Sequence, residues 1–275
     1  EAYEEQCSAD PDIKDFKKFD GQPFSSLLYA QLLKTAGVDG VITVHNHSQS
    51  VQDVFRRTFN DDFDNLAPSE LYAHYLLNSD IVDPGRAGEH LVLCAPDKGA
   101  FEFVERMQGA IGLPGTGICK LTKERTGERK VEIQVAADSQ VPLEGLEGKD
   151  VVVFDDMVRT GSTIVKACQA IRQGRPRRVL FCVSHFYSSE EGRENMASGA
   201  IDEILTLNTM PTILNRDTQG RLRKKLVVLK IEKWIARHLH GYVHMATGTQ
   251  FNEFYSVDMS SKNPRWQPLS LRPVR

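Results

Sequence analysis

A run of thirteen residues in the middle of this chain constrains its fold more than any other feature. The run reads VVVFDDMVRTGST over residues 151–163. Its leading apolar residues are typical of a buried strand in a parallel sheet, and IVKACQAI at 164–171 continues with the apolar spacing of a helix. Since open α/β sheets bind ligands outside the carboxyl ends of their strands, the turn between this strand and helix is a candidate ligand site.

The polar residues of this run predict a sugar phosphate as the ligand. Four small residues precede the predicted helix: Thr160, Gly161, Ser162 and Thr163. Their N–H groups and hydroxyls can bind a phosphate, and the positive N-terminal dipole of the helix adds to the attraction. Asp155 and Asp156 cannot serve a phosphate, because ionised carboxylates only accept hydrogen bonds. They suit two vicinal hydroxyls of a ribose, directly or through Mg²⁺.

Strands and helices alternate along the chain from about residue 25 to residue 230. Helical apolar spacing occurs at 25–37, 69–77 and 100–109. Apolar runs predict strands at 40–44, 90–95, 117–121, 131–135, 151–154, 178–183, 203–207 and 226–230. Such alternation is typical of βαβ units, so we expect an α/β fold with a mostly parallel sheet flanked by helices.

Composition limits the class of protein and its partners. The 275 residues are 40% hydrophobic, which is enough for a core, and the net charge of −3 argues against nucleic acid as the main partner. No apolar stretch approaches the length that spans a bilayer, and no charged-then-apolar leader is seen, so no membrane partner is expected. We expect a cytoplasmic protein with buried free thiols at Cys94, Cys119, Cys168 and Cys182.

The order of strand, acidic pair, T-G-S-T turn and helix resembles the loop that binds 5-phosphoribosyl 1-diphosphate (PRPP). Type I phosphoribosyltransferases and ribose-phosphate diphosphokinases (PRPP synthetases) carry this loop. Neither a P-loop pattern nor a Gly-x-Gly-x-x-Gly fingerprint occurs in the chain to compete for the phosphate. The resemblance implies that Asp155 and Asp156 hold the ribose, and that the turn from Arg159 to Thr163 holds its 5-phosphate.

Two further motifs resemble the metal-binding segments of PRPP synthetases. TVHNHS at 43–48 is similar to the family's T-V-D-L-H-A, which implies that His47 helps to hold the Mg²⁺ of MgATP. APDKGA at 95–100 is similar to S-P-D-x-G-G, which implies Asp97 as a second metal ligand. The expected cofactor is therefore Mg²⁺, and the expected substrates are ATP and a ribosyl phosphate.

A third motif, LTKER at 121–125, resembles the lysine–arginine loop of the same family. The resemblance implies that Lys123 and Arg125 close over the transferring phosphates. Phosphoryl-type transfer depends chiefly on positioning and on neutralising charge, which Mg²⁺, lysine and arginine supply.

The chain departs from the family pattern at several positions that bear on the site. Arg159 stands where the family's D-D-x-x-D-T carries an aspartate, and so reverses a charge beside the ribose phosphate. His45 replaces the aspartate of T-V-D-L-H-A. The family's ATP loop reads roughly Y-A-R-Q-D, and its nearest counterpart, at residues 3–7, keeps Gln6 as the candidate ATP-binding residue but lacks the arginine and aspartate.

The resemblance implies tandem phosphoribosyltransferase-type domains. Such an enzyme should open with a βαβ unit before the helix at 25–37, and none precedes it, so we expect the first domain to be incomplete in this chain. The expected division is a partial ATP-side domain over 1–68, a ribose-phosphate-binding domain over 69–240 and an extension over 241–275. A homo-oligomer is also expected.

The leading functional hypothesis is Mg²⁺-dependent transfer of diphosphate from ATP to the 1-hydroxyl of a ribose 5-phosphate moiety, with release of AMP. The same chemistry on a larger acceptor such as ADP-ribose is an alternative, because Arg159 adds positive charge where a second phosphate would lie. A catalytically weak regulatory homologue is another, since residues of the ATP loop are missing. A phosphoribosyltransferase that consumes PRPP is the third alternative.

Overall fold

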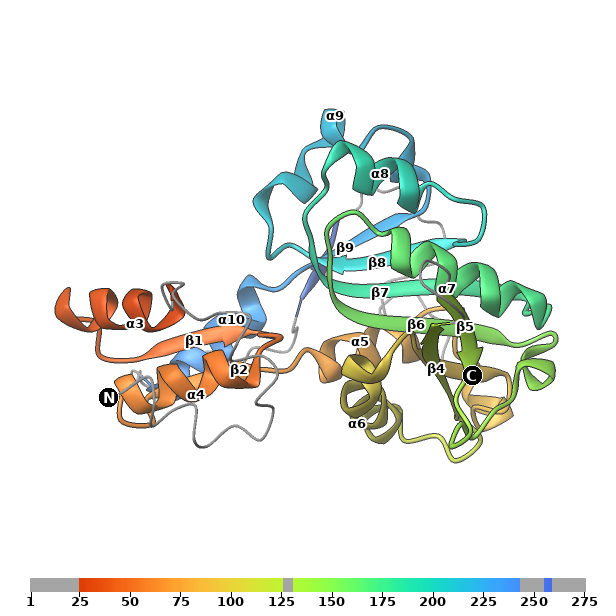
Figure 1. Cartoon of the computed structure of the whole chain (residues 1–275), viewed down its shortest axis with the longest axis horizontal. Coiled ribbons are helices and arrows are strands. Elements are labelled where there is room, and N and C mark those ends of the chain that lie inside the picture. The colour runs from red at the N-terminus through yellow and green to blue at the C-terminus, as the bar shows by residue number, and fades with distance from the viewer. Residues whose placement is uncertain (1–24, 126–130, 243–254, 259–275) are drawn as a thin grey trace. The chain divides into compact units, whose positions relative to one another are not determined.

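The structure is a computed structural model, which describes residues 25–125, 131–242 and 255–258. The chain forms two compact units, Glu1–Asn65 and Leu66–Arg275, and each is described by itself (Figure 1). The expected division into domains over 1–68, 69–240 and 241–275 stays a prediction. Within the described ranges, no helix combines the length and the apolar character needed to cross a membrane.

The described part of the first unit is a small α/β arrangement. Its elements are α3 (Ser25–Thr35), β1 (Val41–Val44), α4 (Gln49–Thr58) and β2 (Phe63–Leu66). Strands β1 and β2 form a two-stranded sheet. Ala30 of α3 packs with Val54 and Phe55 of α4 and with Phe59 and Phe63 in a buried cluster. The helix and strand predicted at 25–37 and 40–44 are confirmed, whereas α4 and β2 were not predicted.

The second unit is built around one sheet with the order β10-β9-β8-β7-β6-β3-β4-β5. Its strands are β3 (Leu91–Ala95), β4 (Gly117–Arg125), β5 (Val131–Val135), β6 (Asp150–Val158), β7 (Arg178–Phe186), β8 (Glu203–Leu207), β9 (Leu226–Lys230) and β10 (Ser256–Val257). Six of these strands run parallel to their neighbours, while β5 and β10 are antiparallel additions to β4 and β9. The predicted α/β fold with a mostly parallel sheet is confirmed.

Helices flank this sheet. The helices of this unit are α5 (Ser69–Leu77), α6 (Phe101–Ile111), α7 (Ser162–Gln173), α8 (Glu190–Met196), α9 (Arg216–Gln219) and α10 (Glu232–Tyr242), of which α5, α6 and α7 pack on the buried faces of the strands. Because β3, β6 and β7 are parallel neighbours, their carboxyl ends meet at one edge of the sheet. Any ligand site at that edge can therefore draw on residues distant in sequence.

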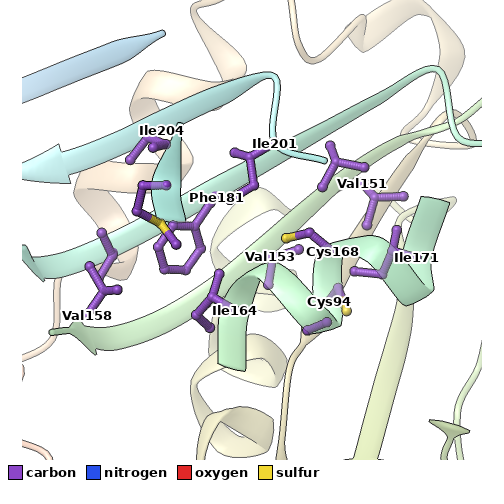
Figure 2. Close-up of a cluster of buried hydrophobic side chains, with 14 of the residues drawn as sticks. Cys94, Val151, Val153, Val158, Ile164, Cys168, Ile171, Phe181, Ile201 and Ile204 are labelled. Carbon is purple, nitrogen blue, oxygen red and sulfur yellow. The ribbon is translucent and has the colours of Figure 1, made fainter. Parts of the chain in front are cut away.

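Strand β6 is buried on both faces, and its residues pack alternately on the two sides. Val151 and Val153 lie in a cluster with Ile164 and Cys168 of α7 (Figure 2). Phe154 packs against the aromatic rings of α5 and α6, with ring centroids 6.1 Å from Tyr72 and 5.9 Å from Phe103. This two-sided burial explains the unbroken apolar sequence of the strand.

The four cysteines of the described residues are free and buried, as the sequence predicts. They are Cys94, Cys119, Cys168 and Cys182. Burial raises the pKa of the Cys168 thiol to about 12, so this group stays protonated at neutral pH. Buried thiols of this kind act as small apolar side chains of the core.

Candidate active site

The acidic pair lies within strand β6 and not in a turn after it. The sequence predicts that the strand ends at residue 154, but β6 continues to Val158, in register with Phe186 of β7. The reason is the length of β7, which carries the parallel ladder four residues beyond the apolar run. The turn that follows is correspondingly short, covering residues 159–161 before α7 begins.

The carboxylates at this edge of the sheet interact with one another. The Asp155 Oδ1 accepts a hydrogen bond from the Asp156 N–H at 2.9 Å. Burial, followed by the nearby carboxylates of Asp156 and Asp97, raises the pKa of Asp155 to about 8. The structure therefore brings together three of the predicted acidic residues. The Asp155 carboxyl is largely protonated at pH 7, and it can become an ionised acceptor when a ligand favours the charged form.

Asp97 comes from the neighbouring strand. It follows β3, which pairs with β6, and its Oδ1 accepts the N–H of Gly99 at 3.1 Å to cap the short 3-10 helix η2 (Lys98–Ala100). This P-D-x-G turn is the reason that the carboxylate stays at the sheet edge. Local side-chain caps of this type fix the direction of an aspartate.

Asp97 carries oxygen donors of the type that Mg²⁺ prefers. Among the described residues, no group of three or more His, Cys, Asp or Glu side chains could hold a metal on its own. Mg²⁺ is usually held by one or two carboxylates together with substrate phosphates and water, so it does not need such a group. Asp97 would be one such carboxylate, with the other ligands supplied by substrate phosphates and water.

The predicted phosphate turn has the expected backbone. Gly161 has φ +75°, a left-handed conformation, and helix α7 begins at the next residue, Ser162. The positive φ makes this position favour glycine, because side chains are strained in the left-handed conformation. Thr160, Ser162 and Thr163 are exposed beside it. The predicted order of strand, turn and helix is confirmed.

The predicted lysine–arginine loop begins as a strand. Lys123 pairs with Ile133 and Arg125 with Val131 in the antiparallel β4–β5 hairpin. This corrects the prediction of a loop at 121–125, because β5 supplies backbone partners out to Arg125. The last residue of β4 that pairs with β3 is Lys120, so the strand projects five residues, about 16 Å, beyond the parallel part of the sheet.

His47 belongs to the first unit and follows β1. The backbone before it turns at His45, which has φ +49°. The side chain of Asn65, at the carboxyl end of β2, holds this turn: its Oδ1 accepts the Asn46 N–H at 2.8 Å and the Thr43 hydroxyl at 3.1 Å. His47 itself is exposed. Gln6, the predicted ATP-binding residue, lies outside the described residues.

We expect Asn65→Ala to destabilise the first unit by about 2 kcal/mol, because the Asn46 N–H and the Thr43 hydroxyl both lose their acceptor. Hydrogen exchange of the β1 amides is the measurement. Gln31→Ala, an exposed position on α3, is the control and should change protection by less than 0.5 kcal/mol, the usual limit for surface substitutions. Equal protection in the two variants would show that Asn65 does not hold the turn.

Comparison with known proteins gives three findings. Residues 77–209 match the family described as phosphoribosyl transferase domain. The ribose-phosphate pyrophosphokinase of Mycobacterium leprae is 29% identical over 202 residues, which cover 73% of this chain and 57% of that protein. The protein of the same name from Corynebacterium efficiens is 28% identical over 229 residues, covering 82% of this chain and 63% of the relative.

The resemblance to the PRPP synthetase family is confirmed. A crystal structure of phosphoribosylpyrophosphate synthetase from Mycobacterium smegmatis shares the fold, with a TM-score of 0.64, 24% identity, and coverage of 82% of this chain and 66% of that one. The chain spans 57% and 63% of the two PRPP synthetase relatives named above.

Sequence reasoning missed the polar residues that hold the His47 turn of the first unit and the phosphate turn of the second unit. Asn65 is one example, and the side chains that contact the phosphate turn are others. Asn65 comes 18 residues after His47, with no motif of its own. Only the tertiary contact reveals its role.

Proposed function

We propose that this chain contributes to Mg²⁺-dependent transfer of a diphosphoryl group from ATP to the 1-hydroxyl of ribose 5-phosphate. The observation that supports this most strongly is the placement of Asp155 and Asp156 directly before a left-handed glycine turn and a helix N-terminus, at the carboxyl edge of a parallel sheet. Acceptors for sugar hydroxyls and donors for a phosphate then lie a few residues apart. The named activity of the PRPP synthetase relatives agrees with this chemistry.

The ribose phosphate would be bound by β6 and the start of α7. Asp155 and Asp156 would accept hydrogen bonds from the ribose hydroxyls. Backbone N–H groups of the turn from Thr160 to Thr163 would donate to the 5-phosphate, with the helix dipole adding favourable charge. Each group then meets the ligand atom whose charge it complements.

His47 and Asp97 are the residues proposed to hold Mg²⁺ with ATP, and the ion would supply neutralising charge to the phosphates. Lys123 and Arg125 are proposed to donate to the transferring group as charge shifts during the reaction. In the step itself, the 1-oxygen of ribose forms a bond to the β-phosphorus, and the bond from that phosphorus to the oxygen shared with the α-phosphate breaks. AMP leaves with that oxygen, and the hydroxyl proton passes to solvent.

No observation favours the larger acceptor. The Arg159 guanidinium carbon lies 6.0 Å from the ring centroid of Tyr187, a cation–π arrangement that accounts for its charge without a second phosphate. The relatives are named for ribose phosphate. We therefore propose ribose 5-phosphate as the acceptor. We also propose that the protein is a homo-oligomer, and light scattering is the test of its oligomeric state.

A coupled assay of AMP release tests the proposal. ATP, Mg²⁺ and ribose 5-phosphate are expected to give AMP, and ADP-ribose in place of ribose 5-phosphate is expected to give much less. AMP release that does not depend on ribose 5-phosphate would contradict the proposal. Binding of ribose 5-phosphate without turnover would favour the regulatory homologue, and release of diphosphate from PRPP with a nucleobase would favour a phosphoribosyltransferase.

A further inference from the structure

Helix α8 holds the phosphate turn through two side chains. The Ser189 hydroxyl, which caps the helix by accepting the Gly192 N–H at 3.1 Å, donates to the Arg159 carbonyl at 3.0 Å. The Asn195 Nδ2 donates to the Thr160 carbonyl at 2.8 Å. Two successive carbonyls of the turn therefore point toward α8.

Close packing keeps the helix against the turn. A Cβ atom on Gly192 would clash with the Arg159 carbonyl oxygen, a backbone atom, and the Met196 side chain packs against Gly161. Gly192 and Met196 are both buried residues of α8. The distance between helix and turn is thus set by contacts that leave no room for a methyl group.

The direction of the carbonyls determines the direction of the N–H groups. A trans peptide is planar, so the C=O of one residue and the N–H of the next point in opposite directions, and no cis peptide occurs in the described residues. The N–H groups of Thr160 and Gly161 therefore point away from α8. Within the described part of the chain, neither donates a hydrogen bond to a backbone or side-chain acceptor.

Two such N–H groups side by side form a binding site for an anion. Successive N–H groups can converge on an anion where the backbone turns through a left-handed residue, and Gly161 has φ +75°. The first N–H groups of α7, which have no partner within the helix, continue the same surface. The turn and the start of α7 therefore both contribute backbone donors for one phosphate.

We propose that Ser189 and Asn195 are positioning residues for the 5-phosphate of the ribosyl ligand. Ser189 sets the direction of the Thr160 N–H, because it holds the Arg159 carbonyl of the same peptide. Asn195 sets the direction of the Gly161 N–H through the Thr160 carbonyl. The inference rests on the proposed function, since it takes the turn to bind the ligand phosphate.

Asn195→Ala is the main test, because it removes the donor to Thr160 without removing the helix cap. We expect it to raise the Kd of ribose 5-phosphate about tenfold, the effect of losing one aimed donor to a charged group. Asn195→Asp should raise the Kd further, since a carboxylate cannot donate and repels the carbonyl. Glu194→Ala, the preceding exposed residue of the same helix, is the matched control and should leave the Kd unchanged.

Amide NMR gives a readout that a merely structural role would not move. In the wild type, the Thr160 and Gly161 amide resonances are expected to shift strongly when ribose 5-phosphate is added. In Asn195→Ala the shift of Gly161 should fall most, and in Ser189→Ala that of Thr160. Ser189→Thr, which keeps the hydroxyl, should restore the wild-type shift.

The outcomes separate this inference from the proposed function. A wild-type protein that binds no ribose 5-phosphate would overturn both. A wild type that binds it, with an Asn195→Ala variant that binds equally well, would overturn the positioning role alone. If Asn195→Ala does not fold, the wild-type titration still decides, because an unmoved Gly161 amide would show that its N–H does not face the phosphate.

Discussion

Lys123→Ala combined with Arg125→Ala is expected to lower kcat for diphosphate transfer by about 100-fold or more and to leave the fold intact. Both residues lie in the part of β4 that projects beyond the parallel sheet and is paired only with β5. The resemblance to the PRPP synthetase family implies that these two cations close over the transferring phosphates. Loss of one preorganised electrostatic contact to a transition state typically lowers kcat by about 100-fold or more. Steady-state kinetics and thermal unfolding are the measurements.

The control removes the same net charge elsewhere. Lys149 precedes β6 and Lys224 precedes β9, so both lie at the amino edge of the sheet, opposite the proposed site. Lys149→Ala with Lys224→Ala should leave kcat within a factor of about two, the size of a surface electrostatic effect. A similar loss in both double variants would indicate a general effect of charge, and an unchanged kcat in the Lys123 and Arg125 variant would remove these residues from the mechanism.

The fully buried strands could be predicted from the sequence. The bounds of β8 and β9 agree with the predicted 203–207 and 226–230, because both strands have a mostly apolar sequence that is buried in the sheet. The sequence predicts that strand β6 ends at residue 154, because the two aspartates that follow are typical of a turn. Burial by the long neighbour β7 outweighs that local preference.

Helix α4 could have been found. Ser48 is an N-cap whose side chain accepts the Val51 N–H, and Val51, Val54 and Phe55 have helical spacing. The turn that precedes this helix is also held by Asn65, which has no local signal. Its role depends on the pairing of β1 with β2, and no sequence pattern encodes which polar side chain meets which loop.

The same limit applies to the phosphate turn. The residue types of the turn indicate a phosphate, but they do not say which way each peptide faces. Ser189 and Asn195, about 30 residues later, determine that through hydrogen bonds to two carbonyls. The chemistry of the candidate site could be predicted from neighbouring residues in the sequence. The direction of its peptide groups depends on the packing of α8 on the turn, which no local pattern indicates.

Asp155→Asn is expected to stabilise the unliganded protein at pH 8 and to weaken ribose 5-phosphate at the same time. In the folded protein the pKa of Asp155 is about 8, against about 3.9 for an unfolded chain. Between these two values the folded state keeps a proton that the unfolded state has lost. The free energy of unfolding therefore falls as pH rises from about 4 to about 8.

Asparagine has nearly the same shape and does not ionise, so the variant avoids this loss. The full shift would correspond to about 5 kcal/mol, but partial hydration and the shared charge with Asp156 reduce it, and we expect an advantage on the order of 2 kcal/mol at pH 8. At pH 4 the advantage should be close to zero. Asp217→Asn, an exposed position in α9, is the control and should show no such trend. Urea unfolding at several pH values is the measurement.

Ligand binding by Asp155→Asn should change in the opposite sense. An ionised carboxylate accepts the ribose hydroxyls, so the affinity of the wild type for ribose 5-phosphate should rise as pH increases from about 6 to about 8. Asp155→Asn should lose this pH dependence and bind about 10- to 100-fold more weakly at pH 8, the effect of losing a charge-assisted hydrogen bond. Calorimetry with ribose 5-phosphate and with ATP tests the role of the two carboxylates. In the double variant Asp155→Asn with Asp156→Asn, the affinity for ribose 5-phosphate should fall far more than the affinity for ATP. An equal fall in both affinities would place the two carboxylates at the metal.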